Sequence, residues 1–431
     1  MNYYSLNQQS PKVTFAEAAV RGQAPDKGLY FPEHIPVLPK GFVENIRQYS
    51  KEAVGVTVMK PYVGDSIPDD VLNEIIAETI NFDFPLVPIS NNIGSLELFH
   101  GPTLAFKDVG ARFMSRCLGY FNRHAYHHVT VLVATSGDTG GAVANGFLGV
   151  DGVDVVILYP SGKVSPIQEL QLTTLGKNIR AIEVKGNFDD CQAMVKQAFM
   201  DADLNNKLSL TSANSINVAR WLPQQLYYFF AYQQWQEANP PVICVPSGNF
   251  GNICAGILAH VSGLPVQHFL AACNANDVVP RYMQTQQYEP KNAIATISNA
   301  MDVGNPSNFI RILALFQQQF AHLQQVFSSV SVSDAITEQT IQQVFKQYNY
   351  TLDPHGAVGY HALATYLQQH PEQSGFILET AHPIKFPDTV EKATGQALAY
   401  PQQVQHLLQQ QKQSIVMDAG FEHLKDWLMQ Q

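Results

Sequence analysis

Short apolar runs rich in β-branched residues recur along the chain from about residue 94 onward, separated by longer stretches with helical periodicity. Strands that are apolar along their whole length and alternate with helices are typical of parallel sheets covered on both faces. There are too many such units for one small sheet, so we expect two α/β layers with a cleft between them. The expected strands are 129–133, 153–159, 179–184, 242–245, 269–273 and 376–378, and the expected helices are 108–120, 166–175, 188–200, 222–235, 252–260 and 338–348.

The first ninety residues follow a different pattern. A short helix is predicted at 13–21, and Gly and Pro interrupt the segment 28–39. A longer helix is predicted at 67–82, because Pro68 stands early and apolar residues from Val71 to Ile80 fall on one side. We therefore predict an all-α N-terminal region at 1–92, an α/β core with two subdomains at 93–400, and a helical C-terminal tail at 401–431.

Composition and charge narrow the function classes. The chain has 431 residues, of which 45% are hydrophobic and 14% charged, and its net charge is −10, with no basic stripe of the kind that binds nucleic acid. The longest apolar runs fall short of the roughly 20 residues of a membrane span, and the N-terminus lacks the pattern of a signal peptide. Five cysteines occur without a Cys-x-x-Cys pair, which favours reduced thiols in a cytoplasm over disulfides or a zinc site.

One lysine stands in an apolar and neutral setting. Lys107 ends the segment His-Gly-Pro-Thr-Leu-Ala-Phe-Lys and precedes Asp108 at the start of a predicted helix. The positive end of a helix dipole disfavours an ammonium, so this position tends to lower the pKa of the lysine and to favour imine formation. By itself the segment also fits a lysine at the solvent-exposed junction of a loop and a helix.

Two small turns rich in Gly and hydroxyl groups follow apolar runs. The first brings Thr135, Ser136, Gly137, Asp138 and Thr139, and the second, which lacks the pattern of a Walker loop or a dinucleotide fingerprint, brings Gly248, Asn249, Phe250, Gly251 and Asn252. A turn between a strand and a helix N-terminus is suited to binding an anion through backbone N–H groups. Each turn alone also fits an ordinary helix cap, and Asp138 is unusual in an anion site.

Two further segments carry polar groups that suit a ligand. In 212–220, Asn214 and Ser215 are neutral donors and Arg220 offers a fork suited to a phosphate, although a surface turn is the plainer interpretation. After the strand at 376–378, Thr380 lies where ligand contacts usually occur. The histidines at 100, 355 and 382 are more often structural than catalytic in such positions. Together, one amine and two anion-binding turns are what an enzyme needs to hold pyridoxal phosphate (PLP) beside an amino acid.

Eight ordered motifs resemble those of PLP-dependent threonine synthases of the longer bacterial and fungal type. They are the segments 13–18, 28–32, 96–108, 135–140, 212–220, 246–252, 299–308 and 380–386, which span nearly the whole chain. The resemblance implies the tryptophan-synthase-β-like fold (fold type II) of PLP enzymes. It also implies conversion of O-phospho-L-homoserine and water to L-threonine and phosphate, by γ-elimination of phosphate and β-addition of water.

The resemblance also implies a role for each matching residue. Lys107 matches the Schiff-base lysine, Thr380 the residue at the pyridine nitrogen, and Asp138 a residue at the cofactor hydroxyl. The cofactor phosphate loop matches Gly248, Asn249, Phe250, Gly251 and Asn252, the substrate carboxylate loop matches Thr135, Ser136, Gly137 and Thr139, and the substrate phosphate site matches Asn214, Ser215 and Arg220. Related enzymes often carry Asn at position 138, whereas the longer threonine synthases share the Asp. The sequence leaves open how Asp138 avoids repelling a bound carboxylate.

Two other functions remain open at this point. A threonine or serine dehydratase of the same fold would not need the cluster of Asn214, Ser215 and Arg220, nor this N-terminal segment. A non-catalytic PLP-binding homologue would not need to retain Lys107 together with both anion-binding turns. The sequence favours neither a metal nor an effector domain, and we expect a monomer or a homodimer.

Overall fold

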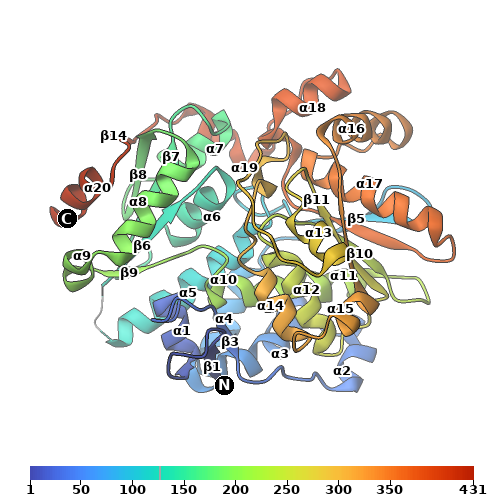
Figure 1. Cartoon of the computed structure of the whole chain (residues 1–431), viewed down its shortest axis with the longest axis horizontal. Coiled ribbons are helices and arrows are strands. Elements are labelled where there is room, and N and C mark those ends of the chain that lie inside the picture. The colour runs from blue at the N-terminus through green and yellow to red at the C-terminus, as the bar shows by residue number, and fades with distance from the viewer. Residues whose placement is uncertain (126–127) are drawn as a thin grey trace.

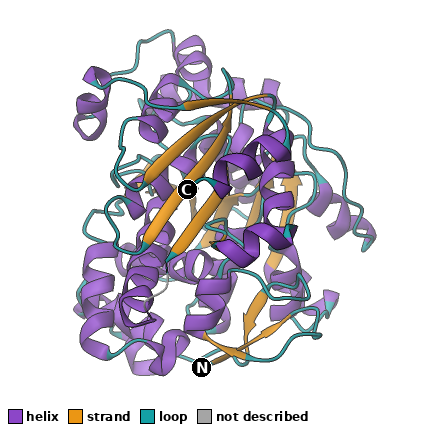
Figure 2. Cartoon of the chain, turned by 90° about the vertical axis from the view of Figure 1, so that its left-hand side faces the viewer, coloured by secondary structure: helices purple, strands orange, loops and turns teal. Residues whose placement is uncertain are grey.

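The computed structural model describes residues 1–125 and 128–431, and two sheets form its centre (Figure 1). The larger has six strands in the order β12-β11-β10-β13-β5-β4, and the smaller has five in the order β14-β8-β7-β6-β9. Every strand pair in these two sheets is parallel except β4 with β5. Helices flank the strands in the second view (Figure 2). The expected α/β fold with two parallel sheets is therefore confirmed.

All six predicted strands are present, and their burial explains why the sequence revealed them. Every residue of β6 and of β10 is buried, as expected for parallel strands covered on both faces. The strands of the larger sheet are β4 (Leu86–Pro88), β5 (Ile93–Glu97), β10 (Val242–Pro246), β11 (His268–Cys273), β12 (Phe327–Ser331) and β13 (Gly375–Glu379). Those of the smaller sheet are β6 (Val129–Ala134), β7 (Val153–Pro160), β8 (Ile179–Lys185), β9 (Ser209–Thr211) and β14 (Ile415–Asp418).

The six helices predicted in the core are present at the predicted positions, but one of them is split into two elements. The predicted helix 222–235 consists of a 3₁₀ turn, η3 (Leu222–Gln225), followed by α11 (Leu226–Gln234). The other core helices are α5 (Lys107–Ala125), α6 (Asp138–Phe147), α7 (Pro166–Thr173), α8 (Phe188–Met200), α9 (Ala202–Lys207), α10 (Val218–Trp221), α12 (Gly251–Val261), α13 (Val278–Thr285), α14 (Phe309–Leu315), α15 (Phe320–Val326), α16 (Asp334–Tyr348), α17 (Pro354–Gln369) and α18 (Pro387–Thr394), with the 3₁₀ turns η4 (Asn299–Met301) and η5 (Pro383–Lys385).

The N-terminal region is not all-α, so that part of the prediction is wrong. The strands β1 (Asn2–Ser5), β2 (Val13–Thr14) and β3 (Tyr30–Pro32) form a small antiparallel sheet. Buried aromatic residues hold it: Tyr3 is fully buried and donates a hydrogen bond of 2.8 Å to the carbonyl of Tyr62. The helices here are α1 (Phe15–Arg21), α2 (Lys40–Glu44), α3 (Lys51–Val63) and α4 (Asp69–Thr79), with the 3₁₀ turns η1 (Ile46–Gln48) and η2 (Gly64–Ser66).

The C-terminal segment is also more than the predicted helical tail. It contains α19 (Gln402–Gln405), η6 (His406–Gln409) and α20 (Phe421–Met429), but β14 pairs in parallel with β8 and completes the smaller sheet (Figure 1). Met417, Leu424 and Leu428 join the core of that sheet. The sequence pattern did not predict this strand because β14 is short and two of its apolar side chains are exposed.

The path of the chain brings distant loops to the same region. In chain order, β4 and β5 belong to the larger sheet and β6 to β9 to the smaller sheet. The strands β10 to β13 belong to the larger sheet again, and β14 belongs to the smaller one. The segments that follow β5, β6, β9, β10 and β13 carry the candidate residues, and each begins at the carboxyl end of a strand that has a parallel neighbour. Ligands in open α/β sheets bind at these ends. Among the described residues, no helix has the length and apolar composition needed to cross a membrane.

Candidate active site

The segment before Lys107 pairs with the segment that contains Thr380. Ala105 and Ala381 form an antiparallel bridge. Around this bridge, the N–H of Phe106 donates to the carbonyl of Thr380 at 2.9 Å and the N–H of His382 donates to that of Leu104 at 3.0 Å. The pairing therefore places Lys107 beside Thr380, although their helix and strand are far apart in the sequence.

Lys107 opens α5 and is only partly exposed. Its Nζ lies 5.7 Å from the centre of the Phe106 ring. Burial lowers the pKa of its ammonium; Asp138 opposes this shift, while Lys385 and Arg220 add to it. A lowered pKa raises the fraction of free amine at neutral pH, and the free amine is the nucleophilic form.

Asp108 fixes the loop in front of Lys107 and is itself buried. Its carboxylate accepts hydrogen bonds from the N–H of Thr103, at 2.9 Å, and from the Thr103 hydroxyl. The hydroxyl of Tyr227 donates to the carbonyl of Phe106 on the other side. These contacts fix the backbone around Lys107 and so limit where its side chain can reach, which a reacting group requires.

In the turn after β6, one hydroxyl group stabilises the turn and two others are available to a ligand. The Thr135 hydroxyl accepts from the N–H groups of Gly137 and Gly140, at 3.0 and 2.9 Å, so it holds the turn together. Ser136 and Thr139 are partly exposed, and neither their hydroxyls nor their N–H groups bond to any other described residue. Gly137 has φ of 144°, which a side chain would strain. The free donors at this helix N-terminus suit a carboxylate.

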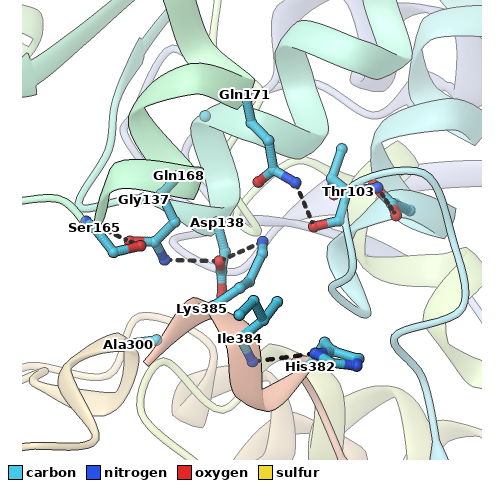
Figure 3. A network of polar contacts seen from close by, with 12 residues as sticks. Thr103, Gly137, Asp138, Ser165, Gln168, Gln171, Ala300, His382, Ile384 and Lys385 are labelled. Atoms are coloured by element: carbon cyan, nitrogen blue, oxygen red, sulfur yellow. Dashed lines mark hydrogen bonds and ion pairs between the residues drawn. The ribbon is translucent and has the colours of Figure 1, made fainter. Parts of the chain in front are cut away.

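Asp138 is buried in the same turn and is held by two donors (Figure 3). Lys385 Nζ lies 2.7 Å and Gln168 Nε2 lies 2.9 Å from its Oδ1 atom. Burial alone would raise the pKa of this carboxyl. The charges of Lys385 and Lys107, with the two hydrogen bonds, outweigh burial and hold the pKa well below its usual range. Asp138 is therefore ionised at neutral pH and compensated by Lys385.

The turn after β10 offers a row of unused backbone donors. The N–H groups of Gly248 to Asn252 make no hydrogen bond within the described part of the chain. Phe250 adopts a left-handed conformation with φ of 60°, which turns the chain into the start of α12. A Cβ atom on Gly248 would lie 2.6 Å from the Cα atom of Met301, so only glycine fits there. This arrangement suits a phosphate bound by backbone groups alone.

Ser215, in the segment 212–220, contacts this turn through its hydroxyl. Its hydroxyl accepts from Asn249 Nδ2 at 2.9 Å and from Asn308 Nδ2 at 3.2 Å. Asn249 also accepts from the N–H and the hydroxyl of Ser307, at 2.6 and 2.8 Å. Asn214 is partly exposed. The segment 212–220 therefore contacts the turn after β10 through Ser215, and Asn214 keeps an accessible side chain.

Arg220 is a buried cation with few partners. Only 3% of its surface is exposed, and its Nη1 donates to the carbonyl of Ala213. Its Nε is buried without a partner, and no carboxylate of a described residue lies within ion-pair distance. Burial lowers the pKa of the guanidinium to about 10, so it remains charged at neutral pH. A desolvated charge of this kind calls for an anionic ligand.

The histidines are engaged in structural contacts. His355 Nδ1 lies 2.6 Å from the carboxylate of Asp353, and its Nε2 accepts from the N–H of Ala300, next to Gly248. His382 Nδ1 accepts from the N–H of Ile384 at 3.1 Å, and burial lowers the pKa of His382 to about 4. His100 pairs with Glu97 at 2.7 Å. Both ring nitrogens of His355 and the Nδ1 atom of His382 are therefore occupied, whereas His100 uses only its Nε2 atom.

Three residues of this region carried no role in the sequence prediction. Lys385 stands within one of the recognised motifs, so its position was available, but only the fold shows that it reaches Asp138. Gln168 lies in a helix with an ordinary amphipathic pattern. Arg311 has no local motif; it is fully buried and donates to the carbonyls of Ser215, Ile216 and Tyr30 and to Asn308. Such long-range contacts leave no signal in a single sequence.

These residues fit PLP. Lys107 supplies an amine with a lowered pKa, and the turn at 248–252 supplies unpaired N–H groups for a phosphate. Thr380 places a neutral hydroxyl at the end of β13, beside the lysine. These are the groups that the PLP aldehyde, phosphate and ring nitrogen require.

Comparison with known families defines the class of protein. Residues 94–378 match the model of pyridoxal-phosphate dependent enzymes. Maize serine racemase covers 72% of the chain with a TM-score of 0.55 at 16% identity, which shows that the two share a fold. The chain is thus a PLP-dependent enzyme of fold type II.

The flanking regions and the nearer relatives define the family. Residues 2–80 match the model of the threonine synthase N terminus, and residues 356–428 match that of the threonine synthase C-terminal region. Threonine synthase of Escherichia coli is 43% identical, with 94% of both chains covered, and that of Haemophilus influenzae is 41% identical over the full length of both. The crystal structure of the Escherichia coli protein superposes with a TM-score of 0.93 over 100% of both chains. PLP-bound threonine synthase from Brucella melitensis gives 0.93 at 34% identity, covering 100% of this chain and 99% of that one. The chain belongs to the threonine synthase family.

Proposed function

We propose that the protein converts O-phospho-L-homoserine and water to L-threonine and phosphate, as the last step of threonine biosynthesis. The observation that carries the substrate assignment is Arg220, a buried guanidinium with unpaired donors close enough to Lys107 to lower its pKa. A phosphorylated amino acid supplies the anion that this cation lacks. The same charge has no purpose in a dehydratase that acts on an unphosphorylated substrate, so the dehydratase alternative is not favoured.

The cofactor is held by residues from both sheets. Lys107 would carry PLP, and Gly248, Asn249, Phe250, Gly251 and Asn252 would hold its phosphate through their N–H groups. Thr380 would serve the pyridine nitrogen, and Asp138 would serve the ring hydroxyl. When bound, PLP supplies the electron sink that stabilises negative charge at the reacting carbons of the substrate. A neutral Thr380 makes this sink weaker than a carboxylate partner would.

The residues of the chain hold the substrate and move its protons. Ser136 and Thr139 bind the carboxylate with the N–H groups of their turn, and Thr135 and Gly137 shape that turn. Arg220 and Asn214 hold the phosphate so that it leaves in one orientation, with Ser215 fixing the neighbouring turn. Lys107, once free as an amine, removes the proton from Cα and then transfers protons at Cβ and Cγ. Water adds at Cβ.

The bounds of the three regions, the location and the oligomeric state are proposals as well. We propose that residues 1–92 form a threonine-synthase-type N-terminal region, residues 93–400 the PLP-dependent core with its site between two subdomains, and residues 401–431 a C-terminal segment. We further propose a cytoplasmic protein that is a monomer or a homodimer. Retention of Lys107 and both turns argues against a non-catalytic homologue.

A steady-state assay tests this function. The PLP-loaded protein is supplied with O-phospho-L-homoserine, and phosphate and threonine are both measured; equal amounts of the two are expected. L-Serine and L-threonine serve as control substrates, with ammonia release as the readout. Ammonia from these substrates without threonine from phosphohomoserine would replace the proposal with the dehydratase alternative.

A further inference from the structure

A buried ion pair joins the two halves of the site, and none of the roles above accounts for its lysine. The side chain of Lys385 is 0% exposed and that of Asp138 is 4% exposed, and their charged atoms lie 2.7 Å apart. Lys385 ends η5, which follows β13 of the larger sheet, whereas Asp138 begins α6, which follows β6 of the smaller sheet. Figure 3 shows the lysine reaching across to the carboxylate.

Both donors use the same oxygen of Asp138. Lys385 Nζ and Gln168 Nε2 bond to Oδ1, while Oδ2 has no hydrogen-bond partner among the residues that the structure describes. Gln168 is held in turn by Ser165, whose N–H and hydroxyl both donate to Gln168 Oε1 at 3.2 Å. The carboxylate is therefore fixed on one side and keeps an acceptor on the other.

Cations dominate the surroundings of this carboxylate. Lys385 on η5 and Lys107 on α5 both stabilise its ionised form, against burial. Lys385 also faces Asp108 on α5 and His382 at the start of η5, and Lys107 also faces Arg220 on α10. Gln168 on α7 is neutral. Lys385 is the one cation within ion-pair distance of Asp138 among the described residues.

The turn around Asp138 must also accept an anion. The N–H groups of Ser136, Asp138 and Thr139 have no partner in the described part of the chain, and they belong to the turn proposed for the substrate carboxylate. An unpaired carboxylate at Asp138 would repel that group through a medium of low dielectric. A cation on Oδ1 removes this repulsion without occupying the free donors.

We propose that Lys385 is a positioning residue that cancels the charge of Asp138 and so allows the turn at 135–139 to bind the carboxylate of the substrate. This proposal rests on the proposed function for the identity of the substrate. Lys385 acts through Asp138 and not on the reacting atoms. In this proposal, the ion pair of Lys385 with Asp138 permits binding of the substrate carboxylate, and the unpaired Arg220 binds the substrate phosphate.

The experiment uses four variants of the full-length chain: Lys385→Met, Asp138→Asn, the double variant with both changes, and Lys392→Met as a control. Lys392 lies on α18, near Lys385 in the sequence, and pairs with Glu338 at 2.8 Å on the surface. The first readout is the melting temperature of the PLP-free chain from pH 8.5 to pH 5.5. The second is KM and kcat of the PLP-loaded chain for O-phospho-L-homoserine.

In the wild type the pKa of Asp138 lies far below this pH range, so its contribution to stability is constant across it. In Lys385→Met the carboxyl loses its nearest cation and burial raises its pKa. The variant should therefore melt about 5 °C below the wild type at pH 8.5, and the difference should shrink as the pH falls and Asp138 takes up a proton. The double variant, which has no buried charge at this position, should show no such pH dependence.

The kinetic constants should also depend on whether Asp138 carries an uncompensated negative charge. Lys385→Met should raise KM by about tenfold or more with a smaller change in kcat, because a buried like charge weakens binding of the carboxylate. The double variant should recover most of this loss, and Lys392→Met should match the wild type. A double variant as impaired as Lys385→Met, or a melting difference independent of pH, would overturn the proposal. The melting experiment needs no turnover, so it tests the charge pairing even where the proposed substrate fails.

Discussion

Two buried arginines lie near the site, and neither forms an ion pair with a carboxylate of a residue that the structure describes. Arg311 donates four hydrogen bonds to oxygens of the chain, and its guanidinium lies 4.4 Å from the centre of the Trp221 ring. Arg220 donates one, from Nη1 to the carbonyl of Ala213. The Nε atom of each arginine is buried without a partner, but Arg311 donates from both Nη atoms and Arg220 from only one. Burial lowers the pKa of each to about 10, so both remain charged at neutral pH. Burial of a charge therefore does not identify a functional residue; the number of unsatisfied donors does.

The contacts of each arginine define what its loss should cost. Arg311 ties the carbonyls of Ser215 and Ile216 to that of Tyr30 in the N-terminal sheet, so it is part of the fold. Arg220 lies on α10 against α5, where a Cβ atom on Gly110 would meet its carbonyl at 2.6 Å. Its backbone is packed against α5, but most of the hydrogen-bond donors of its side chain have no partner among the described residues. We expect stability to depend on the first arginine and catalysis to depend on the second.

The largest effect should come from Arg311→Met. The change removes the donor from the buried carbonyl of Tyr30, from the partly buried carbonyls of Ser215 and Ile216, and from the side-chain oxygen of Asn308. Each buried orphan costs about 1–3 kcal/mol. We expect a loss of several kcal/mol, about 5, in the free energy of unfolding. Chemical denaturation monitored by fluorescence measures it. An unfolding free energy within about 1 kcal/mol of the wild type would show that the carbonyl contacts are not structural.

Arg220→Ala should show the converse pattern. Removing a charge-assisted contact to the substrate phosphate should cost about 2–5 kcal/mol of transition-state binding, or roughly 30- to 5000-fold in kcat/KM. The absorption spectrum of bound PLP should remain, because Arg220 does not hold the cofactor. Arg220→Lys keeps the positive charge but loses the forked pair of donors, and it serves as the matched control. Its kcat/KM should lie between those of the wild type and Arg220→Ala. Turnover of O-phospho-L-homoserine within about threefold of the wild type would remove Arg220 from the site.

Two glycines of one turn allow a finer test of the cofactor phosphate loop. A Cβ atom on Gly248 would lie 2.6 Å from the backbone of Met301, whereas one on Gly251 would lie 3.3 Å from side-chain atoms of Ser215 and Asn308, which can shift. Gly248→Ala should therefore lower PLP affinity about tenfold or more, and Gly251→Ala by less. Larger side chains at Gly251 should weaken PLP retention further. Equilibrium dialysis measures both affinities, and equal losses would contradict the geometry.

The smallest effects should separate two neighbouring hydroxyls. Thr135→Val removes the acceptor of two backbone N–H groups and should lower stability by about 1–2 kcal/mol, raising KM only indirectly. Ser136→Ala removes a hydroxyl with no partner in the described residues, so it should raise KM by about 2- to 10-fold and leave the melting temperature unchanged. Melting curves and initial rates on both variants check this. The reverse pattern would exchange the roles of the two residues.

The sequence predicted the parts of this molecule that depend on local pattern. Strands such as β6 and β10 are buried on both faces and read as continuous apolar runs, and the Gly-rich turns after them are local as well. The same reasoning missed β14, which is short and half exposed, and the N-terminal sheet, whose pairing joins residues far apart along the chain. Lys107, Asp138 and Arg220 could be found because each lies in a motif. Arg311 and the contact of Lys385 with Asp138 could not, because they exist only once the sheets are assembled.

The chemistry proposed for this site depends first on Lys107 as the residue that carries PLP. Borohydride reduction of the PLP-loaded protein, followed by proteolysis and mass spectrometry, tests it most directly, because reduction makes the link to the lysine permanent. We predict a pyridoxyl group on Lys107 alone, and no labelled peptide from Lys107→Ala. A pyridoxyl group on Lys385, the other buried lysine of the site, or on any lysine other than Lys107, would contradict the account.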